Sequence, residues 1–271
     1  MKIAIFIEHA GHEVFHKEVT ILKQFYRDTI AEYDLDMEVF TYTNSDLPDI
    51  KIQDNDIMVP GDHLNDWGKR SYFIMSYIRD YVDCDYIVKT NTSTVLNLKA
   101  LSEFCNSKSF QETPKFYTMW DHVLYHPNVS ESGSVEYLLG KMYLYPKQFL
   151  PDIIRVWDEA TVEGAKIWNI CWGCPPTDDI IMTAAYNILG FPTGKMYGWF
   201  ISLYGYDNGL YHPNFDGDIR KCISYVVKMP FSGNMNGIQA INIDEKNMRT
   251  MMEIPVLEYT IDIIKSIQKY I

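Results

Sequence analysis

The sequence predicts an α/β fold in which a mixed, mostly parallel central sheet is flanked by helices. Two observations carry this prediction. Short apolar runs alternate with longer runs of helical periodicity through the first half of the chain, and such alternation is typical of parallel sheets covered by helices. The length of 271 residues, with 47% hydrophobic composition, suffices for one large core. We therefore expect a single domain over residues 1–271.

The individual elements follow from the spacing of apolar residues, which is short and continuous in strands and recurs every three or four positions in helices. In the first half we expect strands at 2–7, 37–43, 56–59 and 85–89, and helices at 13–33, at 66–82 and from about residue 97. In the second half we expect strands at 115–120 and 137–145, and helices at 146–160, 178–189 and 256–271. Residues 192–240 are rich in Gly, Asn, Tyr and Pro, which predicts loops with brief strands.

A polar segment follows the expected strand at 85–89. It reads Thr90-Asn91-Thr92-Ser93-Thr94 and leaves the carboxyl end of a central strand. Ligands of open parallel sheets bind outside the carboxyl ends of the strands. This segment is therefore the expected position of a ligand.

The charge balance limits the class of partner. The formal net charge is -12, which argues against nucleic acid as a partner, because nucleic-acid affinity comes from Lys and Arg that neutralise phosphates. A small anionic ligand remains compatible with this charge. Backbone N–H groups, a metal ion or one or two cations are enough to bind its phosphates.

The start of the chain lacks the features of a secretory signal. The apolar run at 3–7 is short and leads directly into Glu8 and His9, without a small-residue cleavage site. No stretch approaches the roughly 20 apolar residues that span a bilayer. Five cysteines, an odd number, fit free thiols in a reducing compartment. We expect a cytoplasmic protein with no transmembrane segment, at most peripheral to a membrane.

Three segments in the middle of the chain point to a family. They are residues 85–98 (DYIVKTNTSTVLNL), 140–145 (GKMYLY) and 178–191 (DDIIMTAAYNILGF). In this order they resemble YVLKTDDDVFVNL, GGGYVLS and EDVYVGICLNLLGI, which are motifs of glycosyltransferase family 31. That family comprises β-1,3-galactosyl- and N-acetylglucosaminyltransferases and includes the fringe-like enzymes. The resemblance covers residues 66–191.

The resemblance implies a fold and an activity. The fold is the glycosyltransferase type A fold, and the activity is that of an inverting hexosyl- or N-acetylhexosaminyltransferase. Such an enzyme moves a sugar from a nucleotide sugar, here a UDP-sugar, to a hydroxyl of a glycan or another acceptor. Residues 1–110 would form the nucleotide-binding half, residues 111–255 the acceptor-side half, and residues 256–271 a C-terminal helix.

The acid pair Asp178-Asp179 is the candidate catalytic group. An inverting transferase needs a carboxylate that takes the proton of the acceptor hydroxyl. The resemblance assigns this role to Asp179, with Asp178 as its orienting neighbour. Acids that follow Thr177 also fit the first turn of a helix, where the helix dipole favours negative charge, and this simpler interpretation stays open.

The acidic triplet of the family is replaced in this chain. Asn91, Thr92 and Ser93 occupy the positions of its three aspartates. Amide and hydroxyl oxygens can contact a ribose or a phosphate, but they are weak ligands for a divalent cation. The resemblance implies Mn²⁺ or Mg²⁺ as cofactor, whereas these substitutions predict weak metal dependence or none. A metal-independent enzyme would use a cation instead, such as Lys69, Arg70 or Lys89.

Three further residues are assigned by position. Glu8 and His9 follow the first strand and are expected to border the base of the nucleotide. His212 is the candidate for the late histidine that completes the family's metal site, although a histidine in a surface loop is the alternative.

Two other functions remain open. Loss of the triplet fits an inactive homologue that binds a nucleotide sugar or glycan, whereas retention of Asp178 and Asp179 favours an enzyme. Residues 12–16 read His-Glu-Val-Phe-His, the HExxH signature of zinc metalloproteases. No third ligand follows in a recognisable setting, and these residues also fit the polar first turn of a surface helix.

Overall fold

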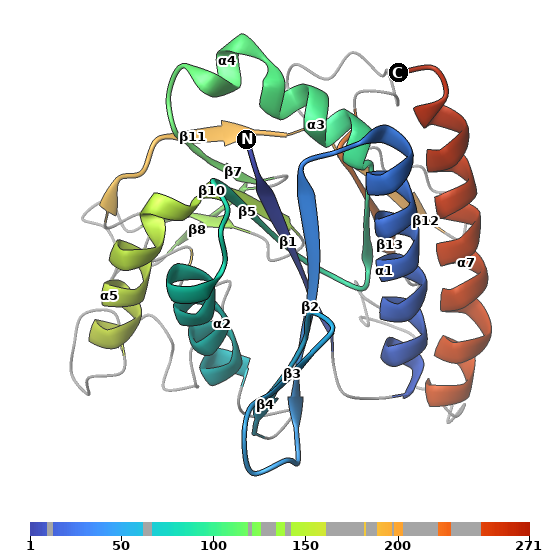
Figure 1. Cartoon of the computed structure of the whole chain (residues 1–271), viewed down its shortest axis with the longest axis horizontal. Helices are drawn as coiled ribbons and strands as arrows, with labels where there is room; N and C mark the ends of the chain where they lie inside the picture. The colour runs from blue at the N-terminus through green and yellow to red at the C-terminus, as the bar shows by residue number, and fades with distance from the viewer. Residues whose placement is uncertain are drawn as a thin grey trace.

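An eight-stranded sheet runs through the molecule, with helices on both of its faces (Figure 1). The computed structural model describes residues 1–9, 13–61, 67–118, 121–125, 134–138, 142–160, 182, 189–196, 198–202, 222–228 and 245–271. The strands of the sheet are β1 (Ile3–Glu8), β2 (Met37–Ser45), β3 (Lys51–Gln53), β4 (Asp56–Pro60), β5 (Tyr86–Asn91), β7 (Phe116–Thr118), β10 (Met142–Pro146) and β11 (Thr193–Lys195).

The order across this sheet is β11-β7-β10-β5-β1-β2-β4-β3. The central strands β5, β1, β2 and β4 are parallel to one another. Strand β10 is antiparallel to both of its neighbours, and β3 is antiparallel to β4. The sheet is therefore mixed and mostly parallel within a single-domain α/β fold, which confirms the predicted fold class.

Two groups of helices cover the two faces (Figure 1). Helices α1 (Glu13–Tyr33), α3 (Leu98–Asn106) and α7 (Glu245–Gln268) lie on one face, and α2 (Trp67–Tyr81) and α5 (Leu150–Ala160) on the other. The short helix α4 (Lys108–Gln111) follows α3, and a 3₁₀ turn (Lys147–Phe149) precedes α5. A smaller sheet has the order β12-β13-β6, and β8 pairs with β9. Their bounds are β6 (Thr94–Leu96), β8 (Asp121–Tyr125), β9 (Ser134–Leu138), β12 (Gly198–Ser202) and β13 (Ser224–Lys228).

Strand β1 shows how the core is divided. Ile3, Ile5 and Ile7 pack in the cluster below α1 and α7, whereas Ala4 and Phe6 pack in the cluster below α2 and α5. This follows from the alternation of side chains along a strand, and a strand buried on both faces is apolar throughout. The two residues that follow Ile7 therefore point to opposite faces of the sheet.

Helix α1 stabilises the strand that follows the polar turn. The hydroxyl of Tyr26, which is fully buried, accepts a hydrogen bond from the N–H of Leu96 (2.8 Å) and donates one to the carbonyl of Thr94 (3.4 Å). Next to them, the Oδ1 atom of Asn97 accepts from the Ala100 N–H and from Gln268 Nε2. Strand β6 is thus fixed by α1 and by the end of α7.

The structure differs from the predicted elements at three places. The hairpin strand β3 has only three residues, too few to give a sequence pattern. The strand expected at 137–145 is two strands, β9 and β10. The last helix begins at Glu245 and continues through Pro255, although proline usually kinks or ends a helix. The helix expected at 178–189 lies outside the described residues except at its positions 182 and 189.

Cys84, Cys105 and Cys222 are buried free thiols. None of the helices in the described ranges combines the length and the apolar character that crossing a membrane requires.

We predict that the Tyr26 hydroxyl stabilises the fold. Replacing Tyr26 by phenylalanine leaves the buried N–H of Leu96 without its partner, so the free energy of unfolding should fall by about 2 kcal/mol, measured by urea denaturation. The control is Tyr259→Phe, because Tyr259 is 62% exposed on α7, and this change should alter stability by less than about 0.5 kcal/mol. Equal effects of the two substitutions would contradict the prediction.

Candidate functional site

Four parallel strands end at the same edge of the sheet, which lies at the lower side of Figure 1. Their last residues are Glu8 in β1, Ser45 in β2, Pro60 in β4 and Asn91 in β5. This is the edge at which α/β folds bind their ligands. The predicted position of the ligand, after Lys89, lies on it.

A buried ion cluster occupies this edge on the face covered by α2. The carboxylate of Glu8 contacts Arg70 Nη2 through Oε1 and accepts a hydrogen bond from Lys89 Nζ at 2.8 Å through Oε2. Arg70 also donates through Nη1 to Asn44 Oδ1 at 2.8 Å. The four side chains come from β1, α2, β5 and β2, and all four residues are at most 8% exposed. We call them the Glu8 cluster.

Glu8 is the acid of the cluster, and Lys89 and Arg70 are its bases. Burial on its own would raise the pKa of Glu8, but the charges of Lys89 and Arg70 and their hydrogen bonds lower it to about 2. Glu8 is therefore ionised at neutral pH. With two cations and one carboxylate, the four named side chains carry a formal charge of +1.

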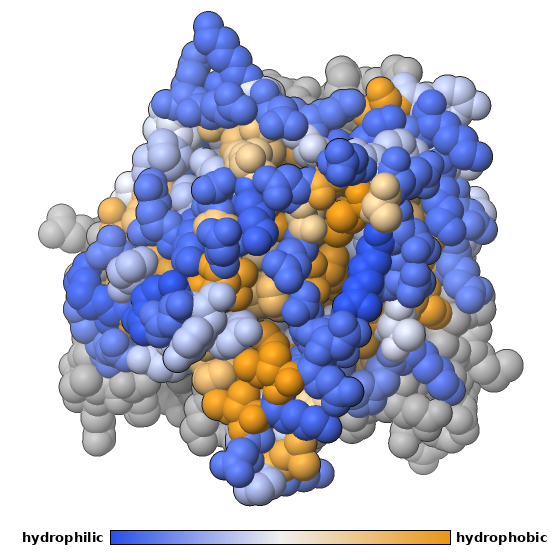
Figure 2. Space-filling view, viewed as in Figure 1, coloured by the Kyte–Doolittle hydropathy of each residue, from blue (hydrophilic) through white to orange (hydrophobic). Residues whose placement is uncertain are grey.

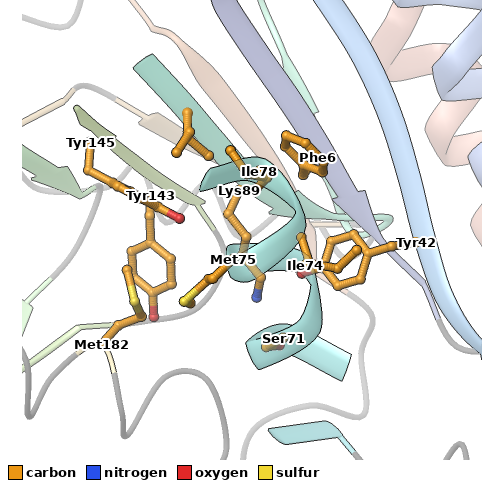
Figure 3. A pocket seen from close by; sticks show the side chains of 11 residues that line it. Phe6, Tyr42, Ser71, Ile74, Met75, Ile78, Lys89, Tyr143, Tyr145 and Met182 are labelled. Atoms are coloured by element: carbon orange, nitrogen blue, oxygen red, sulfur yellow. The ribbon is translucent and has the colours of Figure 1, made fainter. Parts of the chain in front are cut away.

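A small cavity lies between the sheet and α2, beside Lys89 of the cluster. Figure 3 shows Lys89 and Tyr143 projecting from the sheet toward α2, with Met182 beside Tyr143. The Lys89 ammonium lies 5.8 Å from the centroid of the Tyr143 ring, within the range of a cation–π interaction. The cavity has room for about one water molecule, so it is too small for a substrate.

The turn after β5 is ordered by Asn91. Its Oδ1 atom accepts hydrogen bonds from the N–H of Ser93 (3.2 Å), from Ser93 Oγ (2.7 Å) and from Thr94 Oγ1 (3.3 Å). Thr92 is buried, and Asn91 and Ser93 are half-buried. The amide oxygen of Asn91 thus holds the turn in shape.

Glu8 and His9, predicted together beside a nucleotide base, lie on opposite faces of the sheet because they are consecutive residues of one extended segment. Glu8 belongs to the cluster under α2. The ring of His9 faces α1, where it meets the ring of His16 with centroids 5.0 Å apart. That either residue borders the base of a nucleotide stays a prediction.

Arg70 and Lys89, predicted as cations for a phosphate, are both paired with Glu8. Lys69 lies in α2, but its side chain is outside the described part. Asp178, Asp179 and His212 also lie outside it, as does His12 of the HExxH segment. Among the residues that the structure describes, no three His, Cys, Asp or Glu side chains gather as metal ligands do.

Sequence reasoning missed Asn44 and Tyr143. A signal for Asn44 exists, because it continues the alternation of Phe40 and Tyr42, which both face α2, and is the first polar residue of that series. Tyr143 has no such signal. It reaches Lys89 because β10 pairs with β5 in antiparallel register, which places Tyr143 opposite Lys89.

Comparison with known proteins gives matches among solved structures. No family model and no curated protein matches the sequence. The crystal structure of the galactosyltransferase LgtC with donor and acceptor sugar analogs covers 85% of this chain and 88% of that chain, with TM-score 0.50 and 10% identity. A glycosyltransferase involved in glycosylation of the major capsid of PBCV-1 covers 94% of this chain and 100% of that chain, with TM-score 0.49 and 12% identity.

The LgtC match, together with the sheet order and the two helical layers, decides the fold. The chain has the glycosyltransferase type A fold. In this type A fold the Glu8 cluster and the turn at Asn91 lie together at the carboxyl edge of the central strands. At 10% identity the LgtC match establishes the fold alone, so the family 31 resemblance stays a prediction.

We predict that Glu8 is required for stability. In Glu8→Gln the buried Arg70 and Lys89 lose the carboxylate that both contact, and the free energy of unfolding should fall by about 3 kcal/mol at pH 7. The matched control is Glu112→Gln, which removes an exposed ion pair with Lys108 at 3.8 Å and should cost less than about 0.5 kcal/mol. Chemical denaturation of both variants measures the difference, and similar values for the two would refute the role of Glu8.

The lowered pKa of Glu8 also predicts a pH dependence. Because this pKa falls from 4.5 to about 2 on folding, the stabilisation is complete above pH 4.5 and is lost as the pH falls toward 2. Its size is about 3 kcal/mol. Unfolding curves at several pH values should show this loss in the wild type but not in Glu8→Gln. Parallel pH profiles of the two proteins would contradict the assignment.

Proposed function

We propose that the chain is a glycosyltransferase that moves a sugar from a nucleotide sugar to a hydroxyl of a glycan or another acceptor. The donor diphosphate binds at the carboxyl edge of β1 and β5, against the turn formed by Asn91, Thr92 and Ser93. The observation that carries this proposal is the Glu8 cluster, because it places an arginine and a lysine at the ligand-binding edge of a type A fold, beside the turn at Asn91.

The proposed diphosphate site needs no divalent cation. Carboxylates are the usual ligands of Mn²⁺ and Mg²⁺, and the turn offers an amide and two hydroxyls in their place. Asn91 Oδ1 already accepts three hydrogen bonds within the turn. The hydroxyl of Thr92 and the cations Arg70 and Lys89 stabilise the charge of the leaving diphosphate, and Ser93 lines the site.

Asp179 is the proposed base, with Asp178 as its neighbour. Support comes from Met182, which is described and lines the cavity with Lys89 and Tyr143 (Figure 3). Three residues of chain span at most about 11 Å. A carboxylate at position 179 is therefore within reach of the edge where the Glu8 cluster lies.

The finer assignments come from the family 31 resemblance. They are the inverting course, the UDP-sugar donor and the transfer of a hexosyl or N-acetylhexosaminyl group. The LgtC structure, described as a galactosyltransferase in complex with donor and acceptor sugar analogs, agrees with a sugar-transfer reaction but lends no support to any one of these assignments. The cytoplasmic location stays a prediction.

One observation favours a second function. Both cations of the cluster are paired with Glu8, and the Asn91 oxygen is occupied within its turn. A homologue that binds a nucleotide sugar without turning it over would have the same features. The two functions differ in catalysis, so an activity measurement separates them.

The test is hydrolysis and transfer with a panel of UDP-galactose, UDP-glucose, UDP-N-acetylglucosamine and GDP-mannose, in EDTA and with Mn²⁺. We expect turnover of a UDP-sugar in EDTA at a rate within about threefold of that with Mn²⁺. Asp179→Asn should lower kcat by about 10²–10⁴-fold, whereas Asp262→Asn, at an exposed position of α7, should change it little.

The outcomes are distinct. Binding of a nucleotide sugar without turnover would favour the inactive homologue, and turnover that requires Mn²⁺ would contradict the metal-free site. Retained activity in Asp179→Asn would remove Asp179 from the mechanism. The anomeric configuration of the product, read by NMR, tests the inverting course.

A further inference from the structure

A groove runs between α1 and the strands β2 and β4, on the face of the sheet opposite the Glu8 cluster. It encloses about 760 Å³, including space open to solvent, which is in the range of small-molecule sites. Its walls come from α1 (His16, Val19, Thr20, Lys23, Gln24, Arg27), from the β1 end (His9), from β2 (Thr41, Thr43) and from the β3–β4 hairpin (Asp54, Asp56, Ile57, Met58). In Figure 2 a hydrophilic strip follows α1 where it borders the sheet.

The register of the strands arranges the floor of the groove in rows. Thr41 lies beside Asp56, and Thr43 beside Met58, across the parallel pair β2 and β4. His9 continues the second row, because its N–H bonds to the Tyr42 carbonyl in the ladder between β1 and β2. The hydroxyls of Thr41 and Thr43, the carboxylate of Asp56 and the side chain of Met58 thus lie on two neighbouring strands.

The formal charges of the groove cancel in pairs. Lys23 Nζ contacts Asp56 Oδ1 at 2.6 Å, and Arg27 contacts Asp54 at 3.3 Å. Lys23 also donates to the Asp54 carbonyl at 2.7 Å. These four residues carry no net charge, so the groove gives no electrostatic preference to an anion or a cation.

Thr43 points to a ligand. The residue is 5% exposed and lines the groove, and its hydroxyl oxygen is buried beneath the groove surface with no hydrogen-bond partner among the described residues. Buried hydroxyls are normally paired, because leaving one unpaired is costly. A ligand hydroxyl in the groove, met by rotation about χ1 of Thr43, would supply the missing partner.

We infer that the groove binds a neutral, polyhydroxylated ligand, namely a part of the acceptor or product glycan outside the reacting sugar. Each sugar hydroxyl both donates and accepts hydrogen bonds, so two neighbouring hydroxyls match a carboxylate and an ammonium held side by side, as in Asp56 and Lys23. The side chains of Val19 and Met58 cover the C–H groups of a ring. This inference rests on the proposed function and names a site for its acceptor class.

The location fits such a role. The groove reaches the carboxyl edge at His9, whose Cα lies one peptide unit, about 3.8 Å, from that of Glu8. A glycan held there has one end beside the edge that we assign to the reaction. The sheet separates the rest of the groove from the cavity of Figure 3.

The test is a titration of the full chain with lactose, cellobiose, maltose and N,N′-diacetylchitobiose, followed by NMR, with UMP as a charged probe. We expect saturable binding of at least one disaccharide, weakened about fivefold or more in Thr43→Val. The melting temperature of this variant should not fall, because the Thr43 hydroxyl makes no hydrogen bond that the substitution removes. The matched control is Thr29→Val, since Thr29 is buried in α1 outside the groove and bonds the Phe25 carbonyl.

A second variant keeps the test independent of Thr43. Thr20→Arg places a large side chain at an exposed position of α1 that lines the groove, and it should abolish disaccharide binding while the fold is retained. Binding of none of the four disaccharides, binding unchanged in Thr20→Arg, or competition by UMP would overturn the inference. Disaccharide binding by a chain that hydrolyses no donor would support the groove and contradict only the proposed reaction.

Discussion

The ion cluster of Glu8 with Arg70 and Lys89 is the interaction on which the rest of the site depends. A carboxylate that is buried at the end of β1 is tolerated only if cations replace the water it has lost, and this chain supplies two of them, from α2 and β5. The cluster therefore joins the central strand to its neighbour and to a covering helix. It fixes their relative positions at the edge where a type A fold binds its ligand.

The turn after β5 also affects the charge at this edge. An acidic triplet would gather negative charge beside the diphosphate and need a metal ion to neutralise it. With Asn91, Thr92 and Ser93 that charge is absent, and the turn is stabilised by its own hydrogen bonds. In the proposed function, the cations of the cluster and the uncharged turn together bind the diphosphate without a divalent cation.

The fold could be predicted further than the site. Apolar runs such as Ile3–Ile7 fixed the central strands, because burial on both faces leaves a clear pattern, whereas the three residues of β3 leave none. Because Lys89 and Asn91 lie at the end of a predicted strand, they could be placed at the edge of the sheet, but the residues to which they hydrogen-bond could not be predicted. That Glu8 pairs with Arg70, 62 residues away, depends on tertiary geometry. That Glu8 and His9 lie on opposite faces follows from the alternation of side chains along a strand, which the sequence prediction did not apply to this pair.

The two faces of the sheet thus carry different chemistry: a charged, closed cluster below α2 and a neutral, open groove beside α1. The central claim is that a nucleotide sugar binds at the edge between them without a metal. A crystal structure of the protein, from crystals grown with UDP and EDTA, tests this claim most directly. We predict the diphosphate at the carboxyl ends of β1 and β5, against Thr92 and Ser93. UDP bound on another surface, or bound there only after Mn²⁺ is added, would contradict the account.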